Sequence, residues 1–364
     1  MKAAMAVALG ALLGVSILLA WVPQLWAVAL LETGAFALAA AWAAQIALAG
    51  APMERSPLLI PLLLTPAWGL AQLAAGGTVY ARETWGAVLV WAALACVFFA
   101  ALQSFAEERI RERFLFAALL FGFAVSLAWV LGVPSPFLSR NQYAAFIELL
   151  LPLALIRALG HRRGAIPYAV MAAAMYASVI ASASRAGFAL VSLEIAVIAL
   201  VALRRRLASK ALLVTVGLAA VFTVVVGWDV LAARLRQPDP YADRREMLTS
   251  TLAMIGERPF GGLGLGTWST AYPAYALYDD GLIANQAHND WAQWAAEGGL
   301  PFAALLVAFV AALARPAIRS LWGIGLLSVA LHALVDYPFQ KPALAALFFA
   351  LAAALDRGKN IKGS

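Results

Sequence analysis

Apolar segments of similar length recur along the whole chain and leave few folds open. They fall at roughly 3–21, 27–49, 58–75, 85–105, 114–132, 142–159, 166–183, 187–203, 211–229, 298–314, 320–335 and 342–355. An α-helix needs about 20 predominantly apolar residues to cross the roughly 30 Å hydrocarbon core of a bilayer. Spanning β-strands would instead alternate over about ten residues, and the segments show no such alternation. The sequence therefore predicts an all-α integral membrane protein, a single polytopic domain over residues 1–364 with about 12 transmembrane helices.

The composition agrees with this prediction. Hydrophobic residues make up 64% of the chain and charged residues 12%, with a mean hydropathy of +0.86, whereas a soluble domain carries roughly 25% charge. The single cysteine, Cys96, excludes an internal disulfide. The net charge of +7 is interpreted as Lys and Arg residues that set membrane topology, so no nucleic-acid partner is expected. The first apolar segment follows Lys2 without a cleavage site, which predicts a first span and not a removed signal peptide.

The distribution of positive charge predicts the orientation. With a cytoplasmic N-terminus and twelve alternating spans, 17 of the 26 Lys and Arg residues lie on the cytoplasmic side. Only Arg82, Arg140, Arg185 and Lys341 lie in the short outer links. Because Lys and Arg are concentrated in cytoplasmic loops, both termini are predicted to be cytoplasmic and residues 230–297 to form a long periplasmic loop. Arg140 and Arg185 are exceptions to the rule. They are predicted either to contact lipid headgroups or to gather around an anionic ligand.

The long loop contains several elements of its own. Asp243 is a candidate cap for an amphipathic helix from Arg244 to about Gly256 that lies against the membrane or the helix bundle, and Pro259 follows it. The run GGLGLGTW at 261–268 lacks the lysine and the strand context of a phosphate-binding loop. We expect it to allow close backbone packing, and a nest of backbone amides for phosphate oxygens is the alternative.

Histidines and acidic residues provide the candidates for chemistry. His161, His288 and His332 are predicted on different levels of the membrane, so no metal site is expected; a divalent ion at Asp279–Asp280 is the alternative. Histidine accepts protons near neutral pH, and His288 lies in the polar loop, where Asn289, Asp290 or Glu297 could orient it. The bland alternative is an ordinary surface histidine. His332 and Asp336 are predicted to form a buried polar pair with a structural role.

Two segments resemble one family, namely DRREMLTSTLAMIGERPFGGLGLGTW and AHNDWAQWAAEGGLPFAALL, with SRNQYAAF, SASRAGF and LHALVDYPFQKP in support. They are similar to the O-antigen ligases, Wzy-type polysaccharide polymerases and bacterial protein O-oligosaccharyltransferases. The resemblance covers roughly residues 130–345. It implies a GT-C-like glycosyltransferase in the bacterial inner membrane whose periplasmic site uses an undecaprenyl-pyrophosphate-linked glycan, without a cofactor or metal.

The resemblance also implies roles by position. Arg140 and Arg244 are predicted catalytic residues that bind the donor's pyrophosphate, and His288 is the predicted general base or orients the acceptor hydroxyl. Arg185, Arg245, Asp290 and Glu297 are predicted to bind substrate. The Arg244–Arg245 pair leaves open which arginine contacts the pyrophosphate.

Three functions remain in view at this level. The first is an O-antigen ligase that transfers glycan to lipid A core. The second is a polymerase or protein O-oligosaccharyltransferase, which differs only in the acceptor. The third is a transporter, for which paired charges in mid-membrane and inverted repeats are expected. Glu32, Glu148 and Glu194 are the main acidic residues inside the predicted spans, and no repeat is evident.

Overall fold

A computed structural model describes residues 1–160, 165–204, 210–226, 232–233, 236, 242–278, 281 and 283–358. Regular structure in these parts is helical throughout. The helices are α1 (Lys2–Leu18), α2 (Leu25–Ala49), α3 (Leu59–Ala74), α4 (Ala81–Ser104), α5 (Glu108–Val130), α6 (Arg140–Gly160), α7 (Ala165–Ser182), α8 (Arg185–Arg204), α9 (Lys210–Val226), α11 (Ala242–Glu257), α12 (Trp268–Ala271), η1 (Tyr272–Ala274), α13 (Asp290–Ser320), α14 (Ile324–His332), η2 (Pro338–Gln340) and α15 (Pro342–Arg357). The predicted all-α class is confirmed.

Each of the twelve predicted apolar segments coincides with a helix, α1 to α9 and α13 to α15. In the described parts, seven helices are long and apolar enough to cross a membrane, namely α2, α4, α5, α6, α7, α8 and α13. The helices α1 and α3 are apolar but shorter. The chain is therefore a multi-pass membrane protein, and the count of twelve crossings stays a prediction.

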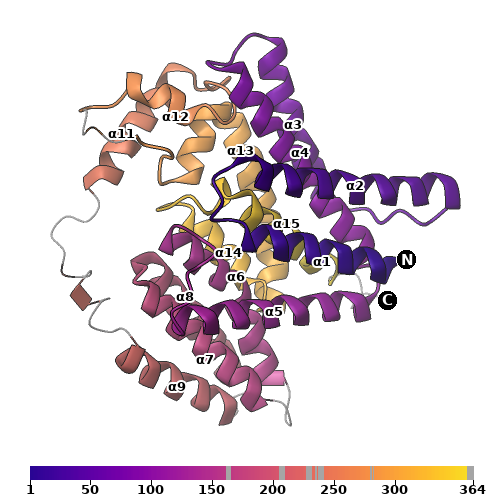
Figure 1. Ribbon diagram of the computed structural model, residues 1–364, viewed down its shortest axis with the longest axis vertical. Helices are drawn as coiled ribbons and strands as arrows, with labels where there is room; N and C mark the ends of the chain where they lie inside the picture. Colours follow the sequence, from indigo (N-terminus) through magenta and orange to yellow (C-terminus); the bar gives the residue numbers. More distant parts are fainter. Residues whose placement is uncertain are drawn as a thin grey trace.

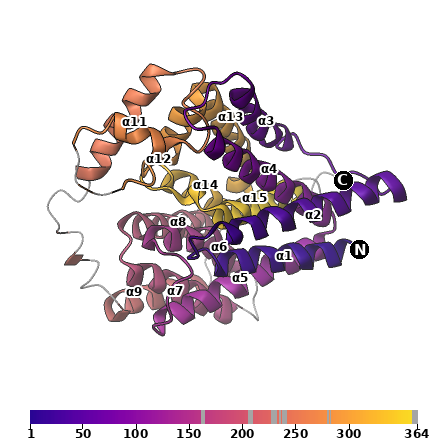
Figure 2. The same ribbon diagram turned by 45° about the horizontal axis from the view of Figure 1, so that its top comes forward.

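Two helices form the centre of the bundle. Nearly every side chain of α6 between Gln142 and Leu155 is buried, and α15 is buried from Ala343 to Asp356. Figures 1 and 2 show the other helices around them, with α1, α2 and α5 on one side and α7, α8 and α9 on another. Alanines in α15 let neighbouring backbones approach closely, as is common where helices pack in membranes.

The helix α13 is kinked. Gly299 has non-helical backbone angles, with φ 78° and ψ 170°, and the amide of Leu300 donates to the carbonyl of Pro259 at 2.7 Å. The predicted tenth span began at residue 298, but helix already forms at Asp290, where Asn289 caps it by accepting from the amide of Ala292. The segment 290–298 is thus a separate short helical piece that packs on the polar region.

The polar region carries its own small core. Met254, Leu263 and Trp268 are buried together, beside α3 and the first part of α13 (Figure 1). The indole of Trp268 stacks on Tyr272 and donates to the hydroxyl of Thr251 at 3.0 Å. The helix predicted from Arg244 to about Gly256 is observed as α11, and this core fixes its position.

Candidate functional site

The glycine-rich turn at 261–268 packs backbone against backbone on the kink of α13. Gly262, Gly264 and Gly266 all have positive φ, and a Cβ on Gly262 would lie 2.2 Å from the carbonyl oxygen of Glu297. Only glycine fits such an approach. The structure therefore agrees with the expectation of close packing.

The amides of this turn are already used within the protein. Those of Leu263 and Gly264 donate to the carbonyls of Ala296 and Glu297. The amide of Leu265 donates to the side chain of Gln72 at 3.1 Å. Because these donors are engaged, the alternative of an amide nest for phosphate is not supported at this turn.

Glu297, a predicted substrate-binding residue, forms hydrogen bonds with the glycine-rich turn. Its carboxylate accepts from the amides of Gly266 and Trp268 at 3.0 and 3.2 Å and from the side chain of Gln293 at 3.0 Å. The side chain is almost fully buried. This geometry orients the carboxylate toward the glycine turn and not toward His288.

A second buried carboxylate, Asp336, lies next to several of the predicted site residues. It lies between α14 and η2 and is only 1% exposed. Arg244, in the first turn of α11, places one guanidinium nitrogen 2.9 Å from Oδ2 of Asp336 and donates through another to the carbonyl of Val335 at 2.7 Å. Such a two-point contact fixes the guanidinium plane. Arg244, and not its neighbour Arg245, therefore faces this carboxylate; Arg245 is exposed.

The beginnings of α6 and α8 meet at the same carboxylate. Asn141 donates through its amide nitrogen to Oδ2 of Asp336. The oxygen of the same Asn141 amide accepts from the hydroxyl of Ser184 at 2.8 Å, and Ser184 caps α8 by accepting from the amide of Gly187.

Arg140 and Arg185 are the first residues of these two helices. They directly precede and follow the Asn141–Ser184 pair in their respective chain segments. The structure thus brings both arginines close to the Asp336 cluster, Arg140 exposed and Arg185 half-buried. The N-termini of α6, α8 and α11 converge there, and helix N-termini carry partial positive charge.

His288 completes the cluster from the other side. Its Nδ1 atom lies 3.7 Å from Oδ2 of Asp336, and its ring meets Tyr337 edge to face with centroids 4.7 Å apart. His288 has φ 51°, a left-handed conformation that is uncommon for a residue other than glycine. The ring therefore faces the carboxylate with Nδ1 just beyond hydrogen-bond distance, and an imidazole in this place can accept a proton.

Asp290, another predicted substrate-binding residue, holds the turn that carries Asp336. Its carboxylate accepts from the amide of Phe339 at 3.0 Å and from the side chain of Gln340 at 2.9 Å. Its own amide donates to the carbonyls of Ala333 and Asp336. The side chain is fully buried. Asp290 therefore stabilises the segment that follows Asp336 and does not face a substrate.

The expected pair of His332 and Asp336 is not formed as such. His332 instead bonds Glu148 of α6 at 2.8 Å through Nδ1, and both side chains are fully buried. Glu194 of α8 is also fully buried, and its carboxyl oxygens have no hydrogen-bond partner in the described parts of the chain. Polar groups are thus present inside the bundle, below the Asp336 cluster.

Charge determines the protonation state of Asp336. Burial alone would raise the pKa of this carboxyl, but the contact with His288 and the positive charge of Arg244 outweigh it and hold the pKa below its ordinary value. Asp336 is therefore an anion at neutral pH. Among the described residues no group of three or more His, Cys, Asp and Glu could hold a metal ion; Asp279 and Asp280 lie outside these residues.

The central part of the chain is similar to a known family. Residues 169–307 match the family model described as O-Antigen ligase. This match supports the O-antigen ligase and Wzy-type family for that part of the chain. The match runs from α7 into α13 and includes Arg185, Arg244 and His288. A search of curated proteins gave no match. The match suggests a membrane enzyme of the glycan-transferring or polymerising kind.

Sequence reasoning did not assign Asp336 to the site, and it noted Asn141 and Ser184 only as parts of resembling segments. Asn141 and Asp336 lie outside the matched range. The sequence contained one indication of their role. Asn141 follows Arg140 and Ser184 precedes Arg185, the two arginines that the predicted topology places on the outer side. Polar residues next to arginines that are exceptions to the charge rule are therefore candidates for the same site.

Proposed function

We propose that the protein transfers a glycan from an undecaprenyl-pyrophosphate carrier to an acceptor hydroxyl at the periplasmic face, as a lipopolysaccharide O-antigen ligase with lipid A core as acceptor. The observation that carries this proposal is the convergence of Arg244, His288 and Asn141 on the carboxylate of Asp336. The guanidinium of Arg244 and the imidazole of His288 thus lie close together near the N-termini of α6, α8 and α11. Leaving-group stabilisation and hydroxyl activation require these two groups.

The arginines act on the leaving group. A pyrophosphate departs readily once its developing negative charge is neutralised, and a guanidinium supplies permanent charge with paired donors. Arg244 and Arg140 bind the pyrophosphate, with Arg185 and Arg245 beside them. The converging helix N-termini add partial positive charge. Preorganised charge of this kind is usually the largest single contribution to catalysis.

His288 acts on the acceptor. The acceptor oxygen attacks the anomeric carbon of the donor sugar while the bond from that carbon to the phosphate oxygen breaks. The bonding electrons leave with the pyrophosphate, and the hydroxyl proton passes to the imidazole. The negative charge of Asp336, 3.7 Å from Nδ1, stabilises the imidazolium that forms. A single displacement inverts the configuration at the anomeric carbon.

The test is a reconstituted transfer reaction. Purified protein in liposomes is given an undecaprenyl-pyrophosphate-linked glycan together with lipid A core, and the products are resolved by mass spectrometry. We expect glycan attached to lipid A core with inverted anomeric configuration. Parallel reactions without lipid A core and with an acceptor protein separate the alternatives: lengthened carrier-linked chains would identify a polymerase, and a modified protein an oligosaccharyltransferase. Absence of any transfer with active donor would overturn the proposal.

A further inference from the structure

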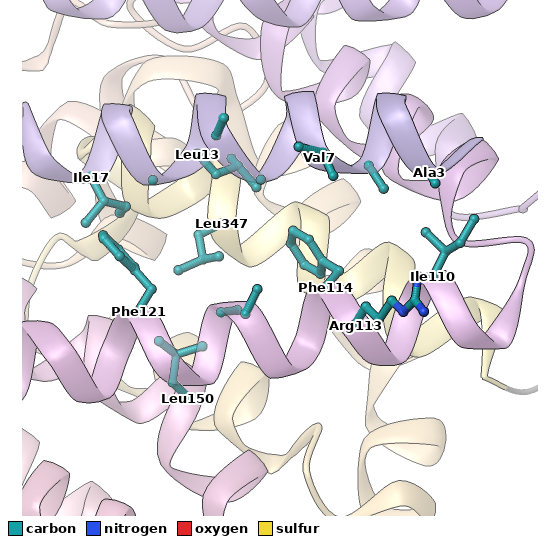
Figure 3. Close-up of a pocket in the computed structure, with 16 residues that line it drawn as sticks. Ala3, Val7, Leu13, Ile17, Ile110, Arg113, Phe114, Phe121, Leu150 and Leu347 are labelled. Atoms are coloured by element: carbon teal, nitrogen blue, oxygen red, sulfur yellow. The ribbon is translucent and has the colours of Figure 1, made fainter. Parts of the chain in front are cut away.

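A groove outside the polar cluster runs between α1 and α5. It encloses about 540 Å³, a volume within the range of ligand pockets. The wall on α1 contains the small residues Ala3, Ala6, Gly10 and Gly14. Figure 3 shows Val7, Leu13 and Ile17 on the same helix and the rings of Phe114 and Phe121 of α5 opposite them. Leu150 of α6 and Leu347 of α15 close its back. A guest in the groove therefore contacts four helices.

The two glycines of α1 in this wall, Gly10 and Gly14, are not in close contact with α5. Glycine and alanine normally let membrane helices approach closely. A Cβ built on Gly14 would meet nothing within 4 Å, and one on Gly10 would only touch Phe114 at 3.8 Å. The groove is thus open space along an apolar wall, and its shape suits a narrow flexible chain.

One end of the groove is cationic. Arg113 lines that end, near Ala3 and Ile110 (Figure 3). Its side chain is exposed, and no hydrogen bond or ion pair is found for it within the described part of the chain. An arginine at the end of an apolar groove matches an anionic headgroup attached to an acyl chain.

The cationic end of the groove lies toward the end of α5 that is remote from the polar cluster. The helix α5 runs from Glu108, near Arg113, to Val130, and residues 131–139 then lead to Asn141. The groove extends along α1 from Ala3 to Ile17, which is roughly 21 Å of helix at about 1.5 Å per residue. One leaflet provides roughly 15 Å of hydrocarbon, half of the bilayer core. The groove is therefore long enough for one acyl chain that starts at the headgroup level.

We propose that this groove binds one acyl chain of an anionic phospholipid, whose phosphate contacts Arg113, from the leaflet opposite the polar cluster. The site is independent of the proposed transfer reaction, because it shares no residue with the Asp336 cluster. A bound lipid fills the open space between α1 and α5 and adds to the contacts that α1 already makes with the bundle.

The experiment measures lipid retention on the full chain by native mass spectrometry. The purified protein in detergent is titrated with phosphatidylglycerol and, separately, with phosphatidylcholine of the same chains. We expect one tightly retained phosphatidylglycerol and weaker retention of phosphatidylcholine. Arg113→Gln should weaken phosphatidylglycerol binding about fivefold, as expected for one arginine at a membrane surface. Gly14→Leu should abolish retention by filling the groove.

Matched variants control for general effects. Arg109→Gln removes an exposed charge from the same helix turn outside the groove, and Gly86→Leu adds the same side chain at an exposed, open position on α4. Both should retain lipid as the unsubstituted protein does. Equal retention of the two lipids, or unchanged retention in Gly14→Leu, would overturn the proposal. So would displacement of phosphatidylglycerol by an equimolar polyprenyl monophosphate, because a prenyl chain would then be the preferred guest.

If Gly14→Leu fails to yield folded protein, Arg113→Gln alone still decides. Its charge change lies at an exposed position, where substitutions usually alter stability by less than about 0.5 kcal/mol. Loss of the preference for phosphatidylglycerol over phosphatidylcholine supports the site, and a retained preference refutes it.

Discussion

Two buried carboxylates in the polar part of the molecule have different surroundings. Glu297 accepts from two backbone amides and from the neutral side chain of Gln293. Asp336 is contacted by Arg244, His288 and Asn141, and the side chains of Arg244 and His288 are 26% and 30% exposed. Backbone donors fix a local fold, whereas partly exposed ionisable donors remain available to a ligand. The glycine-rich turn therefore stabilises the fold, and the Asp336 cluster is the proposed site of the chemistry.

The largest effect is expected on stability at the glycine-rich turn. Gly262→Ala puts a methyl group 2.2 Å from the carbonyl oxygen of Glu297 at φ 67°, so we expect a loss of more than about 4 kcal/mol. Thermal unfolding in detergent measures it. Gly261→Ala is the matched control, since its Cβ would meet nothing within 4 Å. Equal stability of the two variants would show that the turn is not packed as described.

The next effect is expected on activity at the other carboxylate. Arg244→Lys keeps the charge but loses the two-point contact with Val335 and Asp336, so we expect transfer to fall about 10² to 10³-fold with little change in thermal stability. Initial rates of glycan transfer measure this. Arg245→Lys should cause a smaller loss. The reverse order would assign the pyrophosphate to Arg245, and normal transfer in both Arg244→Ala and Arg140→Ala would refute the leaving-group site.

Removal of the proton acceptor should have a somewhat smaller effect. His288→Asn suits the left-handed backbone and removes the ring, so we expect about a 100-fold lower rate without unfolding. The neighbouring Tyr337→Phe keeps the edge-to-face contact and should transfer at nearly the normal rate. Normal transfer by His288→Asn would remove the base assignment while leaving the arginine site intact.

The smallest effect concerns pH. The lowered pKa of Asp336 means that its charge stabilises the folded state above the ordinary Asp pKa of about 4 and that this contribution is lost as pH falls through the lower folded value. The difference in melting temperature between the unsubstituted protein and Asp336→Asn should therefore persist at pH 5. It should shrink toward pH 3. A constant difference down to pH 3 would show that the carboxylate is not held as an anion by its neighbours.

Much of the fold follows from local sequence. Hydrophobic length alone located α2 and α4 to within a few residues, because a membrane helix satisfies its own backbone. The early start of α13 at Asp290 was not predicted. Helix 290–298 is short and carries Asp290 and Glu297, whose polar groups bond the rest of the polar region rather than water, so no apolar run marks it.

The candidate site was predicted only in part. His288 was a candidate from its place in the polar loop, and the resemblance added Arg244. Arg140 and Arg185 stood out because the predicted topology places their positive charge on the disfavoured side. Asp336 was predicted to form a structural pair with His332, whereas its partners are remote in the chain, Arg244 at 92 residues and Asn141 at 195 residues. Contacts between residues so far apart depend on how the helices pack. The periodicity and spacing of residues in a single sequence do not predict them.

The position of Asp336 after α14 has a practical consequence. A chain interrupted between α13 and α14 would keep Arg244 and His288 on the first fragment and place their common counterion on the second. Neither fragment alone should transfer glycan, and co-expression of the two should restore transfer only if α14 docks against α6 and α8. Recovery of activity from separate halves would thus report assembly of the bundle, with the Arg244–Asp336 ion pair as the contact that reconnects them.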